Sequence, residues 1–260
     1  MKILPTKIVP IRAFKDNYIW MIVDEIANKA FVVDPGDATP VIEALNYSPY
    51  TLSGILVTHH HRDHTGGIED LLSYAGNIPV YGSQLSTNST ISHPVKEGSE
   101  VTLSNFKFKV MEIPGHTLDH IAFYIDSILI FSGDTLFSAG CGKIFEGTPE
   151  MMFNSLNKIS QLNDKTQLYC GHEYTLSNLK FAQLVEPSNS DILNRIERTK
   201  MMMESTGCSL PSTLGDERFF NPFLRCAISD VINAAENDAR KKLSNPLQVF
   251  AYLRNWKNTF

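Results

Sequence analysis

The chain has 260 residues, of which 43% are hydrophobic, and carries a net charge of -5 at neutral pH, with a pI near 5.9. This length and composition suit a globular protein with one large core, or a core plus a small second unit. The acidic balance argues against a nucleic-acid groove, which normally needs a basic face. We therefore expect no nucleic acid among its partners.

The sequence carries no signal for export or membrane insertion. Its first residues, Met1-Lys2-Ile3-Leu4-Pro5, lack the apolar run of a secretory signal, and no run of about 18 apolar residues is present to span a bilayer. Four widely spaced cysteines without a C-x-x-C pair are typical of free thiols in a reducing compartment. We expect a cytoplasmic protein that needs no membrane and acts as a monomer.

Strand and helix patterns alternate in the first part of the chain. Three strands, a turn, a helix, a strand and a second helix are predicted in that order over residues 8–14, 18–23, 30–33, 34–36, 38–45, 51–57 and 65–74. Four further strands are predicted over residues 101–103, 106–113, 121–125 and 128–131. This order indicates an α/β protein with helices packed on the faces of its sheets.

The pattern changes near residue 174. A helix over residues 151–162 and a buried strand over 167–169 come before this point, and helices are predicted beyond it over 176–185, 192–203 and 246–256. No alternating strand pattern follows. We therefore predict two domains, residues 1–173 with the sheets and residues 174–260 with helices.

The stretch Thr58-His59-His60-His61-Arg62-Asp63-His64 follows the predicted strand over residues 51–57. Side chains two residues apart point the same way at the end of a strand, so His59 and His61 should converge on one metal. The turn that follows would present Asp63 and His64 to a neighbouring point, so a second metal is plausible. A lone histidine is more often an ordinary polar residue, which is our interpretation of His60 and His93.

Further motifs extend this pattern downstream. They are Gly115-His116-Thr117 with His120, Ser132-Gly133-Asp134-Thr135, and Cys170-Gly171-His172-Glu173-Tyr174. T-H-x-H-x-D-H after a strand resembles the signature of the metallo-β-lactamase superfamily. The G-H-E-Y-T stretch, together with Ala13-Phe14-Lys15-Asp16-Asn17-Tyr18, narrows the resemblance. Over essentially its whole length the chain resembles the glyoxalase II, or hydroxyacylglutathione hydrolase, family.

This resemblance implies an αββα sandwich followed by a smaller α-helical domain that binds glutathione. It implies two divalent metals per chain, with zinc as the first expectation and iron or manganese as alternatives. His59, His61 and His116 match the ligands of one metal, Asp63, His64 and His172 match those of the other, and Asp134 matches the carboxylate that bridges both. Two cations roughly 3.5–4 Å apart can share a solvent molecule and lower its pKa, so that a hydroxide nucleophile exists at neutral pH. Four residues are expected to act directly in catalysis by holding this nucleophile: Asp134, Asp63, His59 and His61.

The resemblance also implies residues that recognise a small-molecule substrate. Lys143 and Tyr174 match glutathione-contacting positions, and Arg254 and Lys257 match a pair that holds the glycine carboxylate. From spacing alone, Arg254 and Lys257 would be a solvated helix face. Phe145 is a further expected substrate contact; it stands where some members have a tyrosine and so lacks that residue's hydroxyl.

Two positions near the third motif bear on the metal loops. The family places a histidine at His120, which is expected to support the ligands. Asp119 stands where a glycine is more usual, and we expect a local adjustment if the backbone needs a positive φ there.

The implied activity is hydrolysis of S-(2-hydroxyacyl)glutathione thioesters, such as S-D-lactoylglutathione, in the second step of methylglyoxal detoxification. Another superfamily enzyme, such as a persulfide dioxygenase with one iron, is the main alternative, and the helical region after residue 174 is the feature expected to separate the two. A nucleic-acid-processing factor or an inactive binding relative is an alternative of a different class. The complete ligand set argues against inactivity.

Overall fold

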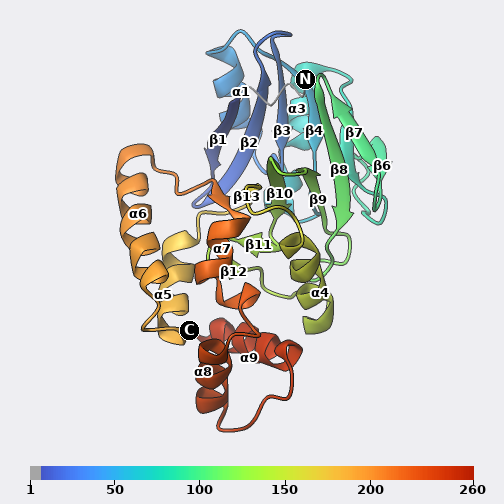
Figure 1. The fold of residues 1–260 in the computed structure, drawn as a ribbon. Helices are drawn as coiled ribbons and strands as arrows, with labels where there is room; N and C mark the ends of the chain where they lie inside the picture. Colours follow the sequence, from blue (N-terminus) through green and yellow to red (C-terminus); the bar gives the residue numbers. More distant parts are fainter. Residues whose placement is uncertain (1–6) are drawn as a thin grey trace. The chain divides into compact units, whose positions relative to one another are not determined.

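The computed structural model describes residues 7–260, which form two compact units (Figure 1). The first unit comprises the described part of Met1–Glu112, with Asp119–Ile125 and Ile130–Gly133. The second comprises Ile113–Leu118, Asp126–Leu129 and Asp134–Phe260. Each unit combines strands with helices, so the predicted α/β class is confirmed.

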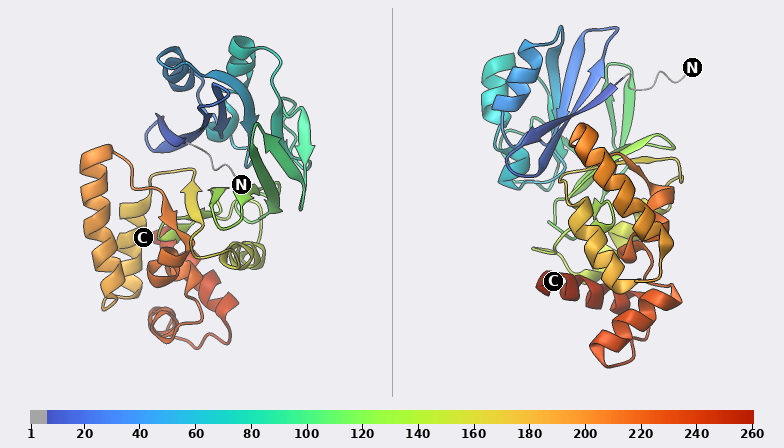
Figure 2. Two further views of the ribbon diagram at one scale, coloured as in Figure 1. Left: turned by 45° about the horizontal axis from the view of Figure 1, so that its top comes forward. Right: turned by 90° about the vertical axis from the view of Figure 1, so that its left-hand side faces the viewer.

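A six-stranded sheet with the order β1-β2-β3-β4-β5-β6 forms the first unit's centre. Its strands are β1 (Lys7–Ala13), β2 (Asn17–Asp24), β3 (Lys29–Val33), β4 (Thr51–Leu56), β5 (Val80–Ser83) and β6 (His93–Val95). Strands β1 to β3 pair antiparallel, and β3 to β6 pair parallel. The crossovers carry helices α1 (Thr39–Asn46) and α3 (Ile68–Ala75), which cover one face of the sheet (Figure 2).

Strand β2 shows why this sheet lies inside the unit, because all eight of its residues are buried. Ile19 and Met21 belong to the core cluster that also contains Val41 of α1 and Leu71 of α3. Trp20, between them in sequence, points to the opposite face and is buried as well. A strand buried on both sides reads as a nearly continuous apolar run, as Tyr18 to Val23 does.

A second sheet contributes the strand order β10-β9-β8-β7 to the first unit. These strands are β7 (Glu100–Leu103), β8 (Phe106–Glu112), β9 (Ile121–Ile125) and β10 (Leu129–Gly133), of which the last belongs to the unit from Ile130. The Ser104 hydroxyl at the β7–β8 turn donates to the Asp24 carboxylate at the end of β2. At the opposite end, Ile121 N donates to Thr58 O, which follows β4, at 2.9 Å. These bonds tie the two sheets of the unit together.

The second unit is mainly helical. Its helices are α4 (Pro149–Ser160), α5 (Thr175–Val185), α6 (Ser190–Thr206), α7 (Leu214–Phe220), α8 (Ser229–Ala239) and α9 (Pro246–Thr259). Helices α5 and α6 lie side by side (Figure 2) and share a core cluster with Ala139 and Phe220. Within residues 7–260, no helix has the length and apolar character needed to cross a membrane.

Four short strands complete the second unit: β11 (Leu136–Phe137), β12 (Gly140–Cys141), β13 (Gln167–Cys170) and β14 (Ser212–Thr213). Strand β14 pairs with β13. The sequence pattern beyond residue 174 did not predict it, because two residues are too few to show an alternation.

The β11–β12 hairpin is held by distant side chains. Glu217, which is fully buried, accepts hydrogen bonds from Ser138 Oγ at 2.8 Å and from Ala139 N at 2.7 Å. The Asn221 amide donates to Phe137 O and to Gly140 O, both at 3.1 Å. Ala139 has a φ of 57°, which is uncommon for a residue other than glycine. The tight hairpin thus depends on polar groups supplied by α7 and the residue after it.

Candidate metal centre

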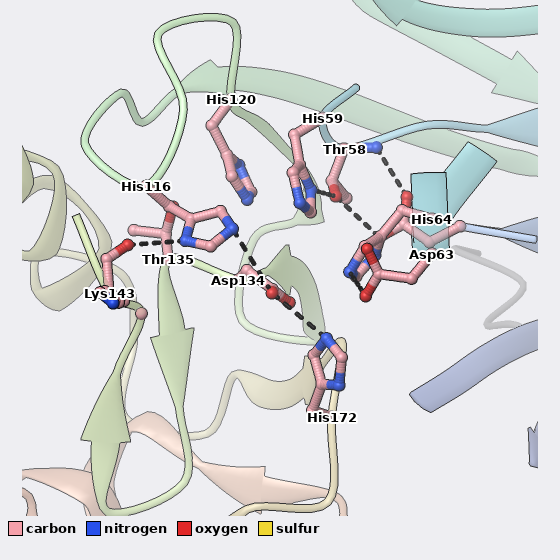
Figure 3. A network of polar contacts seen from close by, with 12 residues as sticks. Thr58, His59, Asp63, His64, His116, His120, Asp134, Thr135, Lys143 and His172 are labelled. Carbon is pink, nitrogen blue, oxygen red and sulfur yellow. Dashed lines mark hydrogen bonds and ion pairs between the residues drawn. The ribbon is translucent and has the colours of Figure 1, made fainter. Parts of the chain in front are cut away.

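Four potential metal ligands of the first unit lie on the loop after β4 and on the short helix α2 (Arg62–Thr65). The His59 ring centroid is 4.8 Å from that of His61 and 4.2 Å from that of His64. Asp63 Oδ2 lies 3.4 Å from His64 Nε2 (Figure 3). The predicted ligands of the T-H-x-H-x-D-H stretch are therefore gathered in one place.

A carboxylate outside this stretch orients two of its rings. Asp34, directly after β3, accepts hydrogen bonds from Thr58 N and Thr58 Oγ1, both at 2.7 Å, and lies 3.1 Å from His64 Nδ1. Thr58 Oγ1 in turn lies 3.0 Å from His59 Nδ1. Both rings are engaged at Nδ1, so Nε2 is the nitrogen that each offers to a metal. Histidine ligands commonly have their second nitrogen held in this way.

The predicted turn over residues 34–36 gave no indication that Asp34 contacts these histidines. A signal was available, because Asp34 follows β3 just as Thr58 follows β4. These strands are parallel neighbours, so their carboxyl ends meet at the same edge of the sheet. A buried carboxylate at that edge is well placed to support ligands on the adjoining loop.

His120 packs on His59 in the same unit. The two rings are stacked, with centroids 4.5 Å apart and an interplanar angle of 12°. Gly133, with a φ of 48°, lies against this stack, and an added Cβ there would come within 2.3 Å of Thr58 Oγ1 and 2.8 Å of His120 Cε1. Only glycine combines this backbone conformation with so close an approach.

Asp119 and His60 form a separate contact, with Asp119 Oδ1 2.9 Å from His60 Nδ1. Asp119 is not among the described non-glycine residues with a positive φ, so this position requires no left-handed backbone. The carboxylate that replaces the usual glycine is buried and contacts an imidazole. His60 is thus a polar residue with a local partner, as we interpreted it.

In the second unit, two imidazoles converge on one carboxylate. His116 Nε2 lies 3.6 Å and His172 Nε2 lies 3.2 Å from Asp134 Oδ2 (Figure 3). His116 Nδ1 lies 2.7 Å from Lys143 O, and because a carbonyl can only accept, Nδ1 carries the proton. Nε2 is then the nitrogen available to a metal, and it faces Asp134. Neutral imidazoles around a carboxylate are a donor set that suits zinc, iron or manganese.

Three of the predicted substrate contacts lie beside these ligands. The Phe145 ring, whose residue is 60% exposed, is 5.2 Å from the His116 ring, and Lys143 Nζ lies 5.2 Å from the Phe145 ring centroid. The Tyr174 ring stacks on His172 with centroids 4.8 Å apart. An exposed aromatic ring and a lysine are therefore presented next to the histidines of this unit.

The remaining two predicted contacts lie on α9 and are packed, in contrast to a solvated helix face. Arg254 is 6% exposed and donates from Nη1 to Cys141 O at 2.6 Å, while its guanidinium lies 5.3 Å from the Phe223 ring centroid. Lys257 Nζ lies 5.2 Å from the Phe181 ring centroid. Burial, followed by the neighbouring Arg254 charge, lowers the pKa of Lys257 to about 8.

Arg254 and Asp134 are connected indirectly, because each contacts the loop after β12. Its Nη1 also lies 3.4 Å from Gly142 O, and a Cβ added at Gly142 would be 1.8 Å from Asp134 O. The next residue is Lys143, whose carbonyl oxygen holds His116. The loop thus links α9 to two of the predicted metal ligands of this unit.

Two family models together match nearly the whole chain. The Metallo-beta-lactamase superfamily model matches residues 14–172, and the model described as Hydroxyacylglutathione hydrolase C-terminus matches residues 173–260. The hydroxyacylglutathione hydrolase of Alkalilimnicola ehrlichii is 48% identical over 97% of this chain and 99% of its own length. The chain belongs to the hydroxyacylglutathione hydrolase family. Relatives of the same name from Vibrio parahaemolyticus and Shewanella pealeana are 46% and 43% identical, over 98% and 97% of this chain respectively and each over 99% of its own length.

Solved structures support the fold of this hydroxyacylglutathione hydrolase family member. ETHE1 from Myxococcus xanthus superposes with a TM-score of 0.65 at 23% identity, over 98% of this chain and 99% of its own. The BLEG-1 B3 metallo-beta-lactamase gives 0.61 at 23% identity, over 84% of this chain and 98% of its own. The expected metallo-β-lactamase fold with a C-terminal helical region is confirmed.

Proposed function

We propose that this chain hydrolyses S-(2-hydroxyacyl)glutathione thioesters, such as S-D-lactoylglutathione, to glutathione and a 2-hydroxy acid. Full-length identity of 43–48% to hydroxyacylglutathione hydrolases is the observation that carries this proposal. The reaction would be the second step of methylglyoxal detoxification and would take place in the cytoplasm. We further propose that the enzyme acts as a monomer on a small molecule, without nucleic acid or membrane, and that residues 1–173 and 174–260 are its two domains.

The proposed metal ligands fall into three groups by role. One metal would be held by His59, His61 and His116, the other by Asp63, His64 and His172, and both by Asp134. The donor chemistry fits, because Asp34 and Thr58 hold His64 and His59 at Nδ1, and because His116 and His172 both turn Nε2 to Asp134. Zinc is the metal we expect, with iron or manganese as alternatives. When bound, two such cations supply a nucleophile at neutral pH and stabilise negative charge on the carbonyl oxygen.

The protein's own groups set the geometry of this reaction. Asp134, Asp63, His59 and His61 are the residues that we propose to position the nucleophile. The leaving group is a thiolate with an ordinary pKa of about 8.5, so its departure does not require a strong general acid. Consistent with this, the proposed site needs no serine or cysteine nucleophile.

Substrate recognition is proposed to use the second unit. Lys143, Tyr174, Arg254 and Lys257 would bind the glutathione moiety, and Phe145 would offer a ring contact in place of a hydroxyl. Lys257, with a pKa of about 8, is mainly protonated at neutral pH. Local positive charge of this kind explains how a chain of net charge -5 can bind an anionic tripeptide conjugate.

Metal analysis combined with thioester hydrolysis tests the proposal. Purified protein should contain two metal equivalents per chain and should hydrolyse S-D-lactoylglutathione, and chelation should abolish both properties. His172→Ala should lose metal and activity, whereas His93→Ala, which changes an exposed histidine, should lose neither. Fully metallated protein without thioesterase activity would refute the proposed function.

A further inference from the structure

A cavity of about 600 Å³ lies in the first unit beside the Asp63 loop. Glycines at positions 36, 66 and 67 line part of its wall, and their missing side chains let the loops after β3 and β4 pack closely, since a Cβ added at Gly36 would be 1.9 Å from Asp63 O. Phe14, from the turn between β1 and β2, and Asn17, the first residue of β2, also line it. Its volume lies within the range of small-molecule sites, roughly 300–1,000 Å³.

Phe14 presents an aromatic ring in this wall. The residue is 62% exposed, and its backbone has a φ of 50°, a left-handed conformation that bulky residues rarely adopt. A Cβ added at Gly36 would lie only 2.8 Å from Phe14 Cε2, so the ring packs against the backbone of that glycine. An exposed ring on a strained backbone is unfavourable for an isolated protein, and such strain concentrates at ligand sites.

The first residue of β2, directly after this turn, holds one of the proposed metal ligands. The Asn17 side-chain amide donates to Asp63 O at 3.2 Å and to Asp63 Oδ2 at 3.0 Å. Asp63 also lines the cavity. A molecule in this cavity would therefore contact Asp63, the one proposed ligand in its wall, and the turn that carries Phe14.

The charge of the cavity distinguishes between the two ends of a glutathione thioester. The cavity wall contains the acidic residues Asp37 and Asp70 and one basic residue, Arg62. The net charge of the wall is therefore negative even if a metal neutralises Asp63. The glutathione moiety carries two carboxylates, which this wall would repel. The lysines and arginine proposed to bind that moiety all belong to the second unit. The acyl end of the substrate carries no charge and suits the cavity better.

We propose that this cavity receives the acyl group of the thioester and that Phe14 determines which acyl groups are preferred. The assignment rests on the function proposed above. The cavity can accommodate more than a lactoyl group, and an aromatic wall favours an aromatic acyl group by stacking or edge-to-face contact.

The test compares S-D-lactoylglutathione with S-D-mandeloylglutathione, whose acyl group carries a phenyl ring. Phe14→Ala should lower kcat/KM for the mandeloyl substrate about three- to tenfold, the usual size of one aromatic contact, and for the lactoyl substrate less than about twofold. Metal content and competitive inhibition by free glutathione should not change. Phe219→Ala is the matched control, because Phe219 is 59% exposed and lies on α7.

Each alternative outcome is decisive. An unchanged preference in Phe14→Ala, an equal loss on both substrates, or the same change in Phe219→Ala would overturn the assignment while leaving the proposed function intact. Loss of metal would show that Phe14 only supports the Asp63 loop. If Phe14→Ala does not fold, Phe14→Leu should show the same preference change, and its absence there counts equally against the assignment. Wild-type protein inactive on both substrates would refute the proposed function and this assignment with it.

Discussion

Replacing Arg254 by alanine is expected to destabilise the protein as well as weaken substrate binding. The buried guanidinium donates to Cys141 O at 2.6 Å, and a charge-assisted bond of this kind contributes about 1.5–3 kcal/mol. The contact with the buried Phe223 ring adds about 2 kcal/mol, because both groups are shielded from water. The bond to Gly142 O is long, at 3.4 Å, and adds little. The free energy of unfolding should therefore fall by about 3.5–5 kcal/mol.

The same substitution should affect turnover through the loop. Without Arg254, the carbonyls of Cys141 and Gly142 lose their donor, and the loop that presents Lys143 O to His116 is less restrained. We therefore expect kcat to fall together with a rise in KM. If Arg254 only bound a carboxylate remote from the scissile bond, its loss would mainly raise KM.

Urea unfolding and steady-state kinetics on S-D-lactoylglutathione measure these two effects. Arg254→Lys keeps the charge but lacks the planar fork, so it should recover part of the KM effect and little of the stability. Arg198→Ala, an exposed change on α6, is the control and should leave both nearly unchanged. If Arg254→Ala unfolds at the wild-type urea concentration and changes KM alone, the argument that Arg254 restrains the loop is wrong.

Three further predictions concern charge and metal. Lys257 loses its proton as pH rises through about 8, so KM for a glutathione thioester should increase above that pH in the wild type. Lys257→Met should not show this increase, and an identical pH profile of KM in both proteins would contradict the prediction. Asp34→Asn should weaken metal binding about 10- to 100-fold in competition with a chelator, and wild-type affinity would exclude a role in orienting the histidines. Asp134→Ala should lose both metal equivalents and lower kcat by orders of magnitude, whereas the exposed change Asp126→Ala should not; full metal content in Asp134→Ala would refute the proposed bridge.

Residues directly after long strands were the easiest to predict from sequence. His59 and His61 follow an apolar strand, and residue spacing alone indicated that they converge. The single helix predicted over residues 65–74 was wrong in detail, because Gly67 N bonds to Pro35 O and the chain divides there into α2 and α3. Local periodicity contains no information about a partner thirty residues away.

Contacts between distant segments were not predictable. The role of Asp34 depends on the parallel pairing of β3 with β4, and the environment of Arg254 depends on a carbonyl 113 residues earlier in the chain. The β11–β12 hairpin has strands of two residues each, so it has no hydrophobic pattern of its own. Sequence therefore indicated which histidines and aspartates lie together better than it indicated which residues hold them in place.

The dependence of the β11–β12 hairpin on Glu217 and Asn221 has a consequence for biosynthesis. Ser138 is separated by 79 residues from Glu217, and Phe137 by 84 residues from Asn221. Every strand of the first unit, by contrast, has been translated by residue 133. Because chains generally fold from the N-terminus as they emerge from the ribosome, the His59 loop can reach its final form while the hairpin beside Asp134 still awaits its partners. The order of translation thus becomes the order in which the two sets of metal-binding side chains are assembled.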